Sequence, residues 1–222
     1  FLVAGELVAN DCGSSAVRTR GAAVVSANSL TALRCDYGVF ADRASTVSID
    51  QDAFATDFTG CTSYAIYALG GATVSGKNVN CDVGRVRAEG ESARIIIPGA
   101  TIATVNSGWH AITIGDGGYV DISGGSASAA GSGARAVEID GGEAIVYSAT
   151  LSSSLSIVVK NKGGICRGHE ATVTVGGTSA ALYIDGGRTY LPSSTFNAVS
   201  SLIFDSLNGG EIDAGSATIN WS

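Results

Sequence analysis

The sequence predicts an all-β fold: a right-handed single-stranded parallel β-helix, or solenoid, of about nine coils with about 23 residues per coil. Three observations support this prediction. A repeat recurs every 20 to 27 residues, apolar residues alternate with period two, and the chain holds 31 Gly, 2 Pro and only 15% charged residues. Many glycines and few charges are typical of short strands joined by many turns.

The repeat is clearest in two phrases, YGVFADRASTV (37–47) and YAIYALGGATV (64–74). Both read aromatic, small, apolar, any residue, Ala, two residues, two small residues, Thr and Val. A pair of small residues, usually Gly-Gly, marks each repeat. Its first members are Gly21, Ala44, Gly70, Gly90, Gly117, Gly141, Gly163, Gly186 and Gly209. The steps between them are 23, 26, 20, 27, 24, 22, 23 and 23 residues, so variable loops join one repeated unit.

The repeated unit is built from strands. Val137 and Ile139, and again Leu182 and Ile184, alternate with polar residues as in a half-buried strand. The glycine pair that follows supplies the positive φ of a sharp turn. The Leu-x-x-Leu-x-Leu ladder of leucine-rich repeats is absent, and so are the six-residue period of left-handed solenoids and the nine-residue calcium-binding repeat. The parallel β-helix remains.

Four cysteines follow the same spacing. Cys12, Cys35, Cys61 and Cys81 lie 23, 26 and 20 residues apart, so we expect them to stack as reduced, buried residues in successive coils. With Cys166 the number of cysteines is odd, and no CxxC pair occurs, so neither disulfides nor a zinc site is expected. We predict no metal and no other cofactor. A reducing site of synthesis fits this cysteine usage.

The composition argues against two classes of partner, nucleic acid and membranes. The net charge of −7, without a basic stripe, argues against nucleic acid. No apolar run approaches the roughly 18 residues of a membrane span, so membrane insertion is not expected. Residues 1–222 are predicted to form a single β-helix domain. Because the chain starts at Phe1 and has no Met, we expect it to be a fragment or processed product of a longer chain.

The two phrases resemble repeats in the β-helical regions of bacteriophage tailspikes and tail fibres, which often carry Tyr-Gly-Ile-x-Ala, a turn of small residues and Val. The resemblance extends from about Cys12 to the end of the chain. It implies a homotrimer at the tip of the virion tail that contacts other tail proteins and a host cell-surface polysaccharide. It also implies synthesis in the host cytoplasm and an extracellular role.

A column of residues between the inward positions is the first candidate site. In successive repeats it contains Arg18, Phe40, Tyr67, Arg87, Thr113, Glu138 and Tyr183. Since the flanking residues are expected to point inward, this column points outward. Exposed aromatic and arginine side chains favour an interface. We therefore predict a binding or trimer-interface role for Phe40, Tyr67, Arg87 and Tyr183, with the trimer favoured over a glycan and simple loop coverage as the alternative.

Three aspartates before glycine pairs are the candidate catalytic residues: Asp116, Asp140 and Asp185. Glycoside hydrolysis needs two carboxylates about 5 to 9.5 Å apart, and neighbouring coils stack about 4.8 Å apart. Asp116 and Asp140, one coil apart, qualify on this spacing. Asp before Gly is also ordinary turn chemistry, and that interpretation is favoured.

Three functions therefore remain. The favoured one is a non-catalytic tail-fibre or tailspike segment that binds a host receptor glycan. The alternatives are a tailspike depolymerase, of hydrolase or lyase type, and a bacterial surface adhesin. An enzyme should show a groove with two close carboxylates of perturbed pKa, whereas a fibre should show an apolar trimer face.

Overall fold

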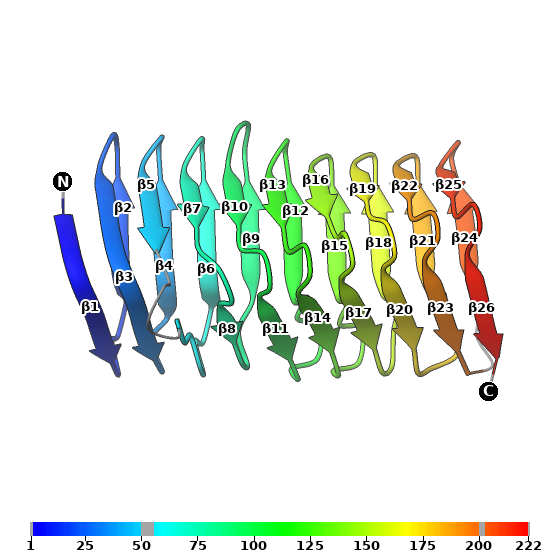
Figure 1. Ribbon diagram of the computed structural model, residues 1–222, viewed down its shortest axis with the longest axis horizontal. Helices are drawn as coiled ribbons and strands as arrows, with labels where there is room; N and C mark the ends of the chain where they lie inside the picture. Colours follow the sequence, from blue (N-terminus) through cyan, green and yellow to red (C-terminus); the bar gives the residue numbers. More distant parts are fainter. Residues whose placement is uncertain (1, 50–55, 200–202, 222) are drawn as a thin grey trace.

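The computed structural model describes residues 2–49, 56–199 and 203–221, and it confirms the predicted fold class. This part of the chain consists of strands and turns, without a helix. Figure 1 shows successive coils along one axis, with the two termini at opposite ends. The coils form three parallel sheets of ten, nine and seven strands, in which each strand pairs with its equivalents in the neighbouring coils.

The strand bounds follow the repeat. The ten-stranded sheet contains β1 (Leu2–Asn10), β3 (Val24–Leu33), β5 (Thr46–Ile49), β7 (Thr73–Ser75), β10 (Arg94–Ile96), β13 (Tyr119–Asp121), β16 (Glu143–Ile145), β19 (Ile165–Arg167), β22 (Arg188–Tyr190) and β25 (Glu211–Asp213). The nine-stranded sheet contains β2 (Ser15–Arg20), β4 (Tyr37–Asp42), β6 (Tyr64–Leu69), β9 (Val86–Glu89), β12 (Ile112–Gly115), β15 (Val137–Asp140), β18 (Val159–Lys162), β21 (Leu182–Asp185) and β24 (Phe204–Leu207). The seven-stranded sheet contains β8 (Asn80–Cys81), β11 (Thr101–Thr104), β14 (Ser126–Ala129), β17 (Thr150–Ser153), β20 (Thr172–Val175), β23 (Thr195–Ala198) and β26 (Thr218–Trp221).

Inward ladders of apolar side chains form the core. In the nine-stranded sheet, for example, Val39, Ile66, Val86 and Ile112 align in register and are almost fully buried. Each such side chain contributes about 1.5–3 kcal/mol relative to its exposed state. Every coil therefore depends on its neighbours for burial, which fixes the register and holds the outward side chains in straight columns.

The two glycines of a pair have different roles. The first takes a positive φ, 82° at Gly141 and 74° at Gly163, as the turn requires. The second needs the space of a missing side chain. A Cβ on Gly142 would lie 2.3 Å from Cγ2 of Ile114, and one on Gly164 would lie 2.3 Å from Cγ2 of Ile139. The turn therefore closes onto the inward side chain of the preceding coil.

The predicted position of the small-residue pair is wrong by one residue at Ala44. Asp42 pairs with Leu69, so Arg43 takes the position of Gly70, and Ala44 takes the position of Gly71. The step into this coil is thus 27 residues, as between Thr46 and Thr73. Comparison of the two aromatic phrases gives this register correctly, whereas counting small residues does not, because Arg43 itself adopts a positive φ of 55° in place of a glycine.

The predicted cysteine ladder is confirmed for three coils and wrong for the fourth. Cys12, Cys35 and Cys61 occupy one register position, as the bonds from Asp11 N to Leu33 O and from Arg34 N to Thr59 O require. The bond from Gly60 N to Asp82 O aligns Cys61 with Gly84 instead of Cys81. Cys81 lies three residues earlier, in β8, although it is buried beside the ladder, and all five cysteines are free thiols.

Candidate functional site

One outward column runs the length of the nine-stranded sheet. It contains, coil by coil, Arg18, Phe40, Tyr67, Arg87, Thr113, Glu138, Lys160, Tyr183 and Asp205. Phe40, Tyr67, Arg87 and Tyr183 are each half-buried. The alignment of the repeats thus places these candidates in one column, with Lys160 and Asp205 as members that the sequence comparison left out.

Four rings gather at the N-terminal half of this face. Tyr37, Phe40, Tyr64 and Tyr67, here called the aromatic patch, come from β4 and β6. Tyr37 and Tyr64 stack with ring centroids 6.1 Å apart, and Phe40 meets Tyr67 edge to face at 5.2 Å. These geometries are the favourable ones for aromatic pairs, so the rings form one half-buried surface.

A break in strand alternation puts two rings of each strand on the same side. In β4 the consecutive residues Gly38 and Val39 are both buried, so Tyr37 and Phe40 both face outward. Gly38 is required there, because a Cβ would lie 2.5 Å from both the carbonyl oxygen of Ala65 and Cδ1 of Phe58. Sequence reasoning with a strict period of two therefore missed Tyr37 and Tyr64.

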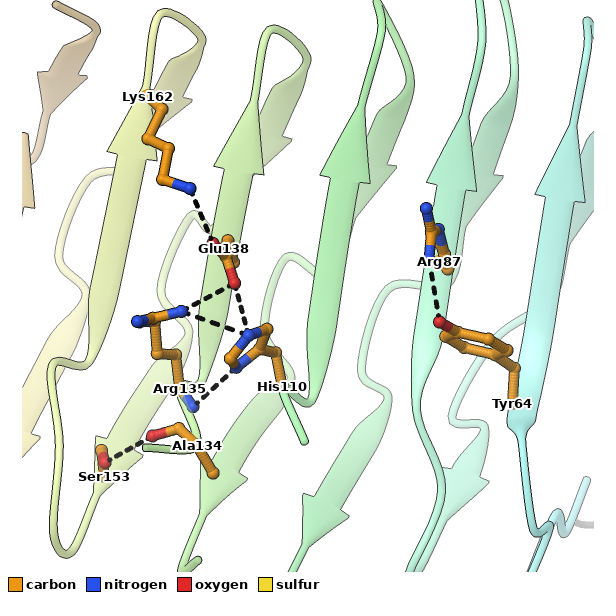
Figure 2. A network of polar contacts seen from close by, with 8 residues as sticks. All are labelled: Tyr64, Arg87, His110, Ala134, Arg135, Glu138, Ser153 and Lys162. Carbon is orange, nitrogen blue, oxygen red and sulfur yellow. Dashed lines mark hydrogen bonds and ion pairs between the residues drawn. The ribbon is translucent and has the colours of Figure 1, made fainter. Parts of the chain in front are cut away.

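Arginines contact the aromatic patch. The guanidinium of Arg18 lies 5.1 Å from the centre of the Phe40 ring. Arg85 lies over two rings, 4.3 Å from that of Tyr64 and 4.1 Å from that of Trp109. Arg87 donates from Nη1 to the Tyr64 hydroxyl oxygen at 3.0 Å, as Figure 2 shows. Such cation–π contacts favour ordered side chains at a surface.

Glu89 completes this end of the site. It accepts a hydrogen bond from the Tyr67 hydroxyl at 2.5 Å and pairs with Nη2 of Arg87 at 2.8 Å. The hydrogen bond from Tyr67 and the charge of Arg87 outweigh burial and lower the pKa of Glu89. Burial and the neighbouring Glu89 raise the pKa of Tyr67 in turn. At neutral pH the pair is an ionised carboxylate with a neutral phenol.

Beside Arg87 and Glu89, over the next coil, lies a hollow of about 270 Å³. Its floor is Thr113 and Gly115, small residues placed in register between larger ones: Arg87 and Glu89 on one side, and Glu138 and Asp140 on the other. The hollow therefore arises directly from side-chain size in two outward columns.

A basic cluster borders the far side of the hollow. Figure 2 shows His110, Arg135 and Lys162 around the Glu138 carboxylate. Arg135 Nη1 lies 2.8 Å from Glu138 Oε2, and Lys162 Nζ lies 3.4 Å from Oε1. Burial alone would raise the pKa of Glu138, but the hydrogen bond from His110 and the three neighbouring basic groups lower it to about 2.

The three candidate aspartates do not share one column. Asp116 is an exposed turn residue with a φ of 49° on the rim of the hollow. Asp140 aligns with Gly115, not with Asp116, and borders the same hollow. Asp185 lies beyond it and accepts a hydrogen bond from Nδ2 of Asn208 at 2.5 Å. The structure thus brings Asp116 and Asp140 to one hollow together with Glu89 and Glu138, and it separates Asp185 from them.

Tyr183 lies apart from the aromatic patch. It pairs in register with Lys160 on one side and Asp205 on the other, and the Lys160 ammonium lies 5.4 Å from its ring centre. Over residues 2–49, 56–199 and 203–221, no group of three or more His, Cys, Asp or Glu side chains has an arrangement that could hold a metal ion. Nor does any helix in these ranges have the length and apolar character to cross a membrane.

The chain matches no protein-family model and no curated protein sequence. A parallel β-solenoid serves many functions, so the fold alone does not assign one to this chain.

Proposed function

We propose that this chain is a segment of a phage tail fibre or tailspike that binds a host-surface glycan along the outward face of its nine-stranded sheet. The observation that carries the proposal is the aromatic patch lying beside the hollow above Thr113 and Gly115. Aromatic surfaces accept the apolar faces of sugar rings, and the polar side chains around the hollow offer hydrogen bonds to hydroxyls. The resemblance of the repeats to tailspike coils supports the phage assignment.

We also propose where this segment acts. The segment acts outside the host cell on the virion tail, after synthesis in the host cytoplasm, and contacts other tail proteins along the fibre. The four buried free thiols agree with synthesis in a reducing compartment. A bacterial adhesin with the same coil would use the same face, so binding alone does not separate these two assignments, whereas adsorption of the intact phage does.

The assembly we propose is a homotrimer joined through the seven-stranded sheet. The seven strands of that sheet contain no Asp, Glu, Lys, Arg or His. One outward ladder consists of Asn80, Thr101, Ser126, Thr150, Thr172, Thr195 and Thr218. Copies with a net charge of −7 repel one another. An uncharged face keeps this electrostatic repulsion between the copies smallest.

A polysaccharide depolymerase is the second candidate, favoured by the carboxylates around the hollow. Glu89 and Glu138 both have lowered pKa values, whereas a hydrolase needs one carboxyl of raised pKa to protonate the leaving group. We therefore expect binding without cleavage. Incubation of a bound polysaccharide with the protein should release no new reducing ends and no unsaturated product. Cleavage that Asp140→Asn abolishes would replace the binding assignment with the enzymatic one.

The test of glycan binding is an array of bacterial capsular and O-antigen polysaccharides probed with three proteins. The wild type should bind a small set of glycans. Tyr64→Ala removes a ring that stacks on Tyr37 and contacts Arg85 and Arg87, so it should weaken binding about tenfold.

The matched control is Tyr147→Ala. Tyr147 is an exposed tyrosine in the turn between β16 and β17, away from the nine-stranded sheet. This variant should bind like the wild type. Equal loss in both variants, or no bound glycan for the wild type, would contradict the proposed site.

A further inference from the structure

The outward face of the nine-stranded sheet concentrates the basic residues of the chain. The nine strands and the two residues before each hold seven of the 13 Lys and Arg: Arg18, Arg20, Arg85, Arg87, Arg135, Lys160 and Lys162. The same segments hold seven of the 20 Asp and Glu: Asp36, Asp42, Glu89, Glu138, Asp140, Asp185 and Asp205. This face is therefore neutral in sum, and the whole net charge of −7 falls on the rest of the chain.

Three of these seven cations have no carboxylate oxygen within 4 Å among the described residues: Arg18, Arg85 and Lys160. Each of the three lies over an aromatic ring of the same face instead. The other four each pair with Asp42, Glu89 or Glu138. The cations without a carboxylate are the ones that remain available to an anion from outside.

Arg85 is the least solvated of the three. Its guanidinium contacts Tyr64 and Trp109, with Nε donating to the backbone oxygen of Ser63 at 2.8 Å. Burial lowers its pKa, and Arg87 nearby lowers it further. Charged groups removed from water are normally paired, because an unpaired one costs several kcal/mol in solvation. The half-buried Arg85 guanidinium has two aromatic neighbours and no carboxylate. It therefore lacks the counter-ion that would offset its loss of hydration.

We propose that the glycan bound by this face is acidic, and that Arg85, held against Tyr64 and Trp109, pairs with its carboxylate or phosphate group. This inference rests on the proposed function. A guanidinium presents a planar fork of N–H donors that matches either anion in bidentate fashion. The ring contacts with Tyr64 and Trp109 hold this fork in place.

Single-stranded nucleic acid would use the same combination of rings and arginines. The observations favour the glycan. Nucleic acid carries a phosphate at every nucleotide, whereas this face has no net positive charge, because its seven cations are balanced by seven carboxylates.

The experiment starts from the polysaccharides that the wild type binds on the array. Those should contain uronic acids or phosphodiesters, and their binding should weaken as salt rises from 50 to about 300 mM. Chemical reduction of the carboxylates to alcohols, or removal of the phosphates, should reduce affinity about 30-fold or more. The two treatments distinguish the carboxylate source from the phosphate source.

The protein side of the test compares Arg85→Gln with Arg94→Gln. Arg94 also lies over a tyrosine, 4.1 Å from the Tyr119 ring centre, but it is exposed and belongs to the ten-stranded sheet. Arg85→Gln should lose about 30-fold in affinity and most of the salt dependence, and Arg94→Gln should match the wild type. Arg85→Lys keeps the positive charge but lacks the planar guanidinium. Its affinity should lie between that of Arg85→Gln and that of the wild type.

The outcomes separate the inference from the function on which it rests. Neutral glycans bound as tightly as acidic ones, without salt dependence, would overturn the acidic assignment and leave glycan binding in place. Binding of no glycan at all would overturn both. Tighter binding of oligothymidylate than of any glycan, with loss in Arg85→Gln, would replace the glycan with nucleic acid. The salt and reduction measurements use the wild type alone, so they decide the question even if a variant fails to fold.

Discussion

At the scale of single residues, glycines set the shape of the turns and one glutamate anchors the basic cluster. Gly142 and Gly164 leave room for the inward isoleucines of the preceding coil. Through a single carboxylate, Glu138 joins His110 of the preceding coil and Lys162 of the next coil. Both kinds of residue act across coils, so each should affect the stability of the whole solenoid when replaced.

Gly142→Ala should destabilise the protein by about 2–3 kcal/mol, because the new Cβ would overlap Cγ2 of Ile114 and the backbone oxygen of Gly118. Gly13→Ala is the control, since a Cβ there meets no atom within 4 Å and φ is not positive. Urea unfolding should place the control within about 0.5 kcal/mol of the wild type. Similar losses in both variants would mean that the turn tolerates the methyl group.

The lowered pKa of Glu138 predicts a pH-dependent contribution to stability. Its pKa in the folded protein is about 2, against an ordinary value of 4.5. The ionised carboxylate therefore stabilises the fold fully above about pH 4.5, by roughly 3 kcal/mol, and this contribution is lost as the pH falls towards 2. Glu138→Gln should be less stable than the wild type at pH 7, and the difference should shrink between pH 4.5 and 2.5.

The control for Glu138 is Glu170→Gln, at an exposed carboxylate in the turn before β20. Urea titrations at pH 7, 4.5 and 2.5 should show no comparable change for this variant. A constant difference between wild type and Glu138→Gln over the same range would show that the cluster does not depend on the charge of Glu138.

At the scale of strands, register decides which residues meet. The alignment of the repeats predicted most of the outward column, because inward apolar residues recur at the same offset from coil to coil. It missed Tyr37 and Tyr64, since the two buried residues after each break the alternation. It missed Arg85, His110 and Arg135 as well. They precede their strands, and only the folded coil shows which ring or carboxylate each contacts.

The cysteine register gives a test at this scale. Cys35, Cys61, Cys81 and Cys166 are buried, and burial raises the pKa of Cys61 to about 11 and that of Cys166 to about 12. Cys12, in the first coil, is only half-buried. Maleimide labelling of the native protein at pH 8 should therefore modify Cys12 first and the other four only on unfolding. Fast native labelling of Cys81 or Cys166 would contradict the coil packing.

At the scale of the whole molecule, the sheets divide the surface by chemistry. The nine-stranded sheet carries aromatic, basic and acidic side chains, whereas the strands of the seven-stranded sheet carry no charged residue. Sequence reasoning placed both possible partners, glycan and sister chains, on the first of these faces. It did not identify the uncharged face of the seven-stranded sheet, since composition alone does not show how hydroxyl residues from distant coils line up on one side.

Trimer formation through the seven-stranded sheet predicts that Ser152→Lys dissociates the assembly. Ser152 lies in an outward ladder between Ser128 and Thr174, and a lysine there would place three like charges in the interface. Ser26→Lys, on the ten-stranded sheet, should remain trimeric. Light scattering after size-exclusion chromatography distinguishes the two. A monomeric wild type, or a trimer unaffected by Ser152→Lys, would contradict this interface.

The most direct test of the central claim is a crystal structure of the chain with the oligosaccharide that binds most tightly on the array. The glycan should lie on the outward face of the nine-stranded sheet, with one sugar against Tyr64 and another above Thr113 and Gly115. Electron density for the glycan on the seven-stranded or ten-stranded sheet, with this face empty, would contradict the account.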